Sequence, residues 1–139
     1  MAKGLLAGKR GLIMGVANDK SIAWGIAKAC ASEGAELAFS YQGEALMKRV
    51  RPLAAEVGSD ILMECDVSDE ASLDRLFADL AKTWGKIDFL VHAIGFSDKN
   101  ELRGRYVDTS ADNFRMTMDI SVYSFTAVCR RAAAMMPDG

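Results

Sequence analysis

The residues from Gly15 to Gly25 have the types and the spacing that suit the binding of an anion. Gly15 follows a short apolar run, Gly11–Met14, and Ser21 opens a stretch with helical periodicity. A strand, a glycine turn and a helix start bring unpaired N–H groups and the positive end of a helix dipole to one place, where a pyrophosphate can sit. The usual fingerprint of such a unit is G-x-G-x-x-G, whereas this chain has Gly15-x5-Ser21. We therefore predict a dinucleotide-binding unit with a variant turn.

Each polar or glycine position of this turn admits two interpretations. Gly15 is either a turn glycine with a positive φ or the point where the backbone approaches a phosphate, and its position favours the second. Ser21 can cap the helix and face the pyrophosphate at the same time. Gly25 costs roughly 1 kcal/mol relative to alanine inside a helix, so we expect close packing of the helix on the sheet there.

Two further positions lie where the second and third strands end. A residue at the end of the second strand normally contacts the adenosine ribose, and an arginine there favours the 2′-phosphate of NADP. This chain has Gln42, which is neutral, so we predict a preference for NAD. Asp66 follows the third strand. It either caps the next helix or holds the adenine amino group, with Val67 packed on the ring.

Strands and helices alternate along the chain without a linker or repeat. We predict strands over Arg10–Met14, Glu36–Tyr41, Ile61–Cys65 and Ile87–Ala93. We predict helices over Ser21–Glu33, through the segment 46–57 with a kink or break at Pro52, after Ser68, and from a capping box at Thr109–Asp112 onward as one long helix.

This alternation predicts an α/β fold, a doubly wound Rossmann-type parallel sheet in the order 3-2-1-4. The residues 1–139 then form one domain or part of one. The ligand crevice is expected where strands one and four end, which brings Gly15, Gln42, Asp66 and Ala93–Gly95 around one cleft.

Composition excludes several other classes of function. The net charge of −2 argues against nucleic acid and anionic membranes as partners, and no apolar run is long enough to span a bilayer. The first eight residues are too short and too weakly apolar for a secretory signal, so we expect a cytoplasmic protein. Cys30, Cys65 and Cys129 are far apart and His92 is the only histidine, so no metal site is predicted and all three cysteines are interpreted as buried.

Taken together, the motifs resemble one family. They are Gly15-x5-Ser21-Ile22-Ala23-x-Gly25-Ile26-Ala27, Gly34-Ala35-Glu36-Leu37-Ala38-Phe39, Cys65-Asp66-Val67, His92-Ala93-Ile94-Gly95-Phe96 and Asp119-Ile120-Ser121-Val122-Tyr123-Ser124-Phe125. In this order they are similar to the bacterial enoyl-acyl-carrier-protein reductases, a branch of the short-chain dehydrogenase/reductase superfamily. Most members of that superfamily carry T-G-x-x-x-G-x-G and N-N-A-G at the first and fourth of these motifs.

The resemblance implies a seven-stranded Rossmann sheet, of which four strands are present here, and a homotetramer. It implies NADH as cofactor and a trans-2-enoyl thioester carried by acyl-carrier protein as substrate. The implied cofactor-binding residues are Gly15, Ser21 and Ile22 at the pyrophosphate, Gln42 at the adenosine ribose, Asp66 and Val67 at the adenine, and Ile94 and Gly95 at the inner ribose. Phe96 and Ser97 would border the substrate pocket.

The family's catalytic tyrosine and lysine are expected beyond Gly139. The resemblance therefore predicts that these 139 residues are the N-terminal, cofactor-binding part of the enzyme and that they are inactive alone. Two alternatives stay open, namely another short-chain dehydrogenase/reductase and a non-catalytic NAD-binding module.

Overall fold

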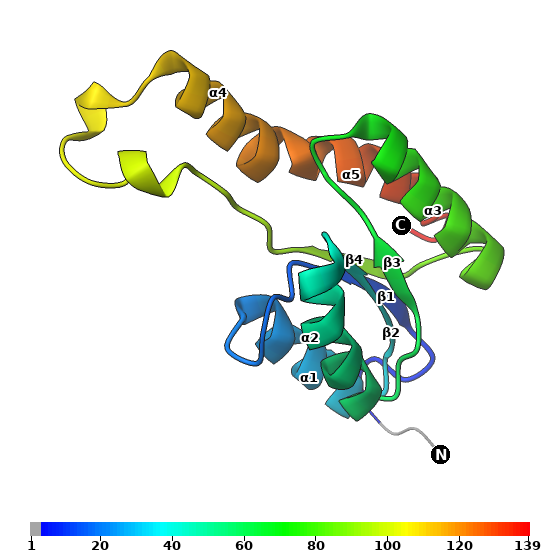
Figure 1. The fold of residues 1–139 in the computed structure, drawn as a ribbon. Helices are drawn as coiled ribbons and strands as arrows, with labels where there is room; N and C mark the ends of the chain where they lie inside the picture. Colours follow the sequence, from blue (N-terminus) through cyan, green and yellow to red (C-terminus); the bar gives the residue numbers. More distant parts are fainter. Residues whose placement is uncertain (1–3) are drawn as a thin grey trace.

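The computed structural model describes residues 4–139, and its centre is a parallel sheet of four strands (Figure 1). The strands are β1 (Arg10–Met14), β2 (Glu36–Tyr41), β3 (Leu62–Glu64) and β4 (Phe89–His92). Their order is β3-β2-β1-β4, which confirms the predicted topology. The central strand β1 pairs with β2 on one side and with β4 on the other, so its carboxyl end lies between theirs.

Helices cover both faces of the sheet, as an all-parallel sheet requires (Figure 1). One face carries α1 (Ile22–Ser32) and α2 (Glu44–Glu56), and the other carries α3 (Glu70–Trp84) and α5 (Ser124–Ala133). Alternate residues of β1 point to opposite layers: Leu12 and Met14 pack with the α3–α5 layer, and Ile13 packs with the α1–α2 layer. No helix within residues 4–139 is long and apolar enough to cross a membrane.

The structure rules out one of two alternatives at each of the middle helices. Pro52 does not break its helix in two, because α2 is one helix of 13 residues with the proline inside it. Pro52 and Lys48, whose carbonyl loses its donor, are both exposed, so water can take the place of the missing bond. Asp66 does not cap α3 either. The cap is Asp69, whose carboxylate accepts from the N–H of Ala71.

The last helical region is not a single α-helix. It begins with two short 3₁₀ turns, η1 (Lys99–Glu101) and η2 (Tyr106–Asp108), and continues as α4 (Ala111–Met118). A π-helical turn, η3 (Asp119–Tyr123), then separates α4 from α5. Such turns interrupt α-helices locally and are frequent at functional sites.

The cap of α4 lies one residue later than predicted. The Ser110 hydroxyl accepts from the N–H of Asn113, and the reciprocal bond to the Ser110 N–H comes from Glu101 in the preceding turn rather than from inside the helix. A side chain from outside the helix therefore completes the cap, which a local capping pattern cannot predict.

Candidate functional site

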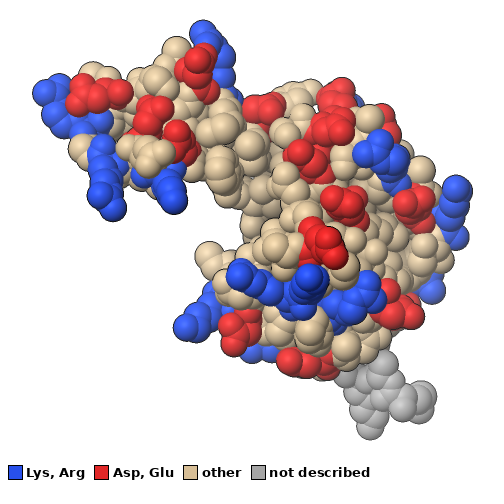
Figure 2. All heavy atoms as spheres, viewed as in Figure 1, with Lys and Arg blue, Asp and Glu red and all other residues tan. Residues whose placement is uncertain are grey.

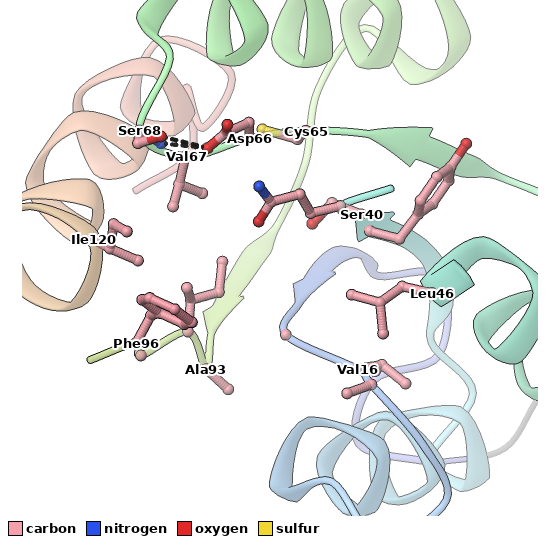
Figure 3. Close-up of a pocket in the computed structure, with 16 residues that line it drawn as sticks. Val16, Ser40, Leu46, Cys65, Asp66, Val67, Ser68, Ala93, Phe96 and Ile120 are labelled. Carbon is pink, nitrogen blue, oxygen red and sulfur yellow. Dashed lines mark hydrogen bonds between the residues drawn. The ribbon is translucent and has the colours of Figure 1, made fainter. Parts of the chain in front are cut away.

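A cleft of about 280 Å³ opens where the strands end. Figure 2 shows the surface hollowed between α4 and the α1–α2 layer, and Figure 3 shows side chains from several elements around the space. The lining residues are Gly15–Ala17, Ser40–Gln42, Leu46, Cys65–Ser68, Ala93–Phe96 and Ile120. Six of the eight residues predicted to bind a cofactor are among them: Gly15, Gln42, Asp66, Val67, Ile94 and Gly95.

Contacts within the protein, without any ligand, explain why residue 15 is a glycine. Its φ is +111°, and a Cβ at this position would overlap the carbonyl oxygen of Ala93, beyond the end of β4. Its positive φ agrees with the turn interpretation, and the close approach that the structure shows is to the backbone of Ala93, just after β4. The approach of a phosphate to Gly15 stays a prediction.

The Ser21 side chain stabilises the turn before α1 and does not cap the helix. Its Oγ accepts from the N–H of Ala17 at 2.9 Å and of Asn18 at 3.0 Å, and it makes no side-chain cap bond to α1. The backbone N–H groups of Ile22 and Ala23 form no hydrogen bond within residues 4–139. The start of α1 therefore presents two N–H donors and one hydroxyl hydrogen that an anion can accept.

Two residues of α1 lie differently from the expectation. Gly25 is exposed, and a Cβ there would meet nothing within 4 Å, so close packing on the sheet does not explain this glycine. The Ile22 side chain is 80% exposed and does not line the cleft. Any contact of Ile22 with a ligand at the helix start would have to come from its backbone N–H or from the outer face of the helix.

The β2–β3 side of the cleft is polar at its rim. Gln42 is exposed directly after β2. Asp66 uses Oδ1 to accept from both the N–H and the hydroxyl of Ser68, at 2.9 and 2.6 Å, while Oδ2 has no partner among the described residues (Figure 3). Val67 points into the same space. One free carboxylate oxygen beside an apolar side chain suits a planar ring with an exocyclic amino group.

The β4 side of the cleft is built from the segment that follows His92. Ile94, Gly95 and Phe96 line it, together with Ile120 from η3, which the sequence analysis assigned no role. The predicted substrate-pocket residue Ser97 does not line the cleft. Its hydroxyl accepts instead from Thr117 at 2.9 Å and from the Asn113 amide at 3.2 Å, so it faces α4.

His92 connects the end of β4 to the helix behind it. Its Nε2 lies 2.8 Å from the Ser124 Oγ, and the Phe125 ring packs edge-on at 5.4 Å. Because the Ser124 hydroxyl donates to the carbonyl of Ile120, we assign the proton of this contact to His92 Nε2. Burial lowers the pKa of His92 below its ordinary value. The imidazole is therefore a neutral structural donor near neutral pH.

The cysteines are less uniformly buried than predicted. Cys65 is buried at the floor of the cleft, and burial raises its pKa to about 11. Cys30 and Cys129 are only half-buried, because they lie at the edges of the apolar faces of α1 and α5. A thiol as poorly ionised as that of Cys65 is a packing residue.

Comparison with known proteins gives one consistent family. The family model described as enoyl-(acyl carrier protein) reductase matches residues 15–139. The chain is 65% identical over 136 residues to the "Enoyl-[acyl-carrier-protein] reductase [NADH] 2" of Rhizobium meliloti, covering 98% of this chain and 51% of that protein.

Two solved structures are similar in the same way. A crystal structure of FabI from Candidatus Liberibacter asiaticus matches with a TM-score of 0.96 and 59% identity, covering 97% of this chain and 52% of that one. An Anaplasma phagocytophilum enoyl-(acyl-carrier-protein) reductase in complex with NAD matches with a TM-score of 0.94 and 55% identity, covering 100% and 54%. The chain spans about half the length of the relatives that it matches.

Proposed function

The chain belongs to the enoyl-(acyl carrier protein) reductase family, and we propose that it forms the N-terminal, cofactor-binding part of an NADH-dependent enoyl reductase. The convergence of Gly15, Gln42, Asp66 and Ile94 on one cleft, in a chain of this family, carries the proposal. The substrate proposed is a trans-2-enoyl thioester on acyl-carrier protein, reduced in fatty-acid biosynthesis. A cytoplasmic homotetramer is proposed as its working form.

The described residues fit a dinucleotide. The free N–H groups of Ile22 and Ala23 and the hydroxyl hydrogen of Ser21 would hold the pyrophosphate at the start of α1. Gln42 would contact the adenosine ribose with its amide. The unpaired Oδ2 of Asp66 would accept from the adenine amino group, with Val67 against the ring face.

Sheet order supports an assignment for the other half of the cofactor. The pyrophosphate position follows β1, the adenosine residues follow β2 and β3, and β4 is on the opposite side of β1. We therefore assign the inner ribose, on the nicotinamide side, to Ile94 and Gly95, and Phe96 would border the substrate pocket beside it. When bound, NADH supplies the hydride for the β-carbon of the enoyl thioester. Residues of this chain bind and orient it, while the tyrosine and lysine that act on the enolate are expected beyond Gly139.

The proposal is tested with the full-length protein. We expect it to oxidise NADH in the presence of crotonyl thioester of acyl-carrier protein, and we expect the 139 residues alone to show no such turnover. An oxyanion donor is typically worth about 10²–10³ in rate, so the loss should be large. NADH binding without turnover by the full-length protein would favour the non-catalytic module. Turnover of a hydroxyl or ketone substrate alone would favour another short-chain reductase.

A further inference from the structure

The segment after β4 is irregular and forms one wall of the cleft. Residues 93–98 form neither helix nor strand, and the cleft is lined by four of them, 93–96. Backbone N–H and C=O groups in such a segment need partners elsewhere, or the segment has no unique position. The Ala93 N–H donates to the carbonyl of Met14 in β1, whereas the backbone groups of Phe96 and Asp98 bond to side chains of η3 and α4.

Three polar side chains, spaced four residues apart along α4 and η3, bond to this segment: Asn113, Thr117 and Ser121. The Ser121 hydroxyl accepts from the N–H of Phe96 at 3.0 Å and donates to its carbonyl at 3.2 Å. The Asn113 Oδ1 accepts from the N–H of Asp98 at 3.0 Å. As described above, Asn113 and Thr117 also donate to the Ser97 hydroxyl. We call Asn113, Thr117 and Ser121 the clamp.

Asn113 is the buried member of the clamp, whereas Ser121 is half-buried and its two bonds to Phe96 are exposed to solvent. Asn113 is only 7% exposed, and in the part of the chain that the structure describes no buried side-chain N or O atom lacks a hydrogen-bond partner. A buried amide whose groups are all engaged favours one arrangement of its partners over others. Ser121 belongs to the π-helical turn η3, as does the cleft residue Ile120. The turn η3 therefore supplies both Ile120, which lines the cleft, and the Ser121 hydroxyl, which bonds to the cleft residue Phe96.

We propose that Ser121, supported by Asn113 and Thr117, is a positioning residue that fixes the Phe96 backbone and so sets the nicotinamide side of the cleft. This inference rests on the proposed function. Both hydrogen bonds of the Ser121 hydroxyl are with Phe96, and no hydrogen bond of the clamp goes to Gln42 or Asp66 at the adenosine side. Loss of the Ser121 hydroxyl should therefore weaken binding of the complete dinucleotide and leave binding of its adenosine half unchanged.

The test compares two ligands on the full-length protein, with dissociation constants from calorimetry. Ser121→Ala should weaken NADH binding by about tenfold, since two hydrogen bonds are lost, and change ADP binding by less than about twofold. Ser121→Thr, which keeps the hydroxyl, should restore NADH binding. Ser32→Ala is the matched control, because the Ser32 hydroxyl only donates to the carbonyl of Ala29 near the end of α1.

The outcomes separate this inference from the proposed function. Unchanged NADH binding in Ser121→Ala would overturn the inference, and so would an equal loss of ADP and NADH binding, which would mark a general loss of structure. Retained ADP binding shows that the variant is folded. A wild-type protein that bound neither ligand would overturn the proposed function, and the inference with it.

Discussion

Gly15 and Ala93 meet backbone to backbone, at the point where β1 and β4 both end. A side chain on Gly15 would overlap the Ala93 carbonyl oxygen, and the φ of +111° disfavours any side chain there as well. The turn that leads into α1 and the segment that forms the far wall of the cleft are thus in contact through Gly15. Backbone strain and overlap with Ala93 both disfavour any other residue at position 15.

Gly15→Ala should destabilise the protein more than a glycine substitution that suffers from backbone strain alone. Gly58, after α2, has a φ of +76° and open space around it, so it is a matched control. We expect about 3 kcal/mol for Gly15→Ala and about 1–2 kcal/mol for Gly58→Ala, measured by denaturant unfolding of the full-length protein. Equal losses in the two variants would mean that the contact with Ala93 contributes nothing.

Gln42 should determine the choice between NADH and NADPH. It is exposed at the end of β2 and carries no charge that could pair with a 2′-phosphate. Gln42→Arg should raise the ratio of kcat/KM for NADPH to that for NADH by about tenfold, because a charge-assisted bond is roughly twice as strong as a neutral one. Gln42→Met, neutral and similar in size, should leave that ratio within about twofold of the wild type, since it adds no charge. A wild-type protein that used NADPH as well as NADH would refute the assignment.

His92 should make the protein less stable as the pH falls. Burial lowers the pKa of His92 in the folded state, so the unfolded chain binds the proton more readily. The stabilisation is fully present above about pH 6.5, the pKa of an unperturbed histidine, and is lost as the pH falls through the lowered value.

The measurement is the apparent melting temperature between pH 7.5 and 5.5 in the wild type and in His92→Gln. Glutamine retains an N–H donor for Ser124 but does not titrate, so its melting temperature should decline less over this range. A steeper decline in the variant than in the wild type would contradict the direction of the shift.

Cys65 should be protected from thiol reagents in the folded protein. With a pKa of about 11 it is roughly 0.1% ionised at pH 8, and it is buried besides. Mass spectrometry after iodoacetamide treatment should find Cys129 labelled before Cys65, and all three described cysteines labelled in urea. Labelling of Cys65 in the folded protein as fast as in urea would show that the cleft floor is open.

The strands, their order and most of the cleft follow from the sequence. Short apolar runs separated by amphipathic segments depend on local residue types, and the rule that parallel strands cross over right-handedly leaves few topologies. Residues that directly follow a strand, such as Gln42 and Asp66, are then brought to the same edge of the sheet without any knowledge of side-chain packing. The same motifs were sufficient to identify the family, which the family model confirms.

The contacts between distant segments were decided only by the tertiary structure. The predicted strand order brings Gly15 and Ala93 to one cleft but does not indicate that their backbones touch, and nothing local to Ser121 indicates Phe96. The cap of α4 was misplaced for the same reason, since Glu101 reaches it from another turn. The π-helical turn at Asp119–Tyr123 has no signature in the periodicity of the helix. Local patterns determine which elements form, whereas the pairing of polar groups depends on which elements the folded chain brings together.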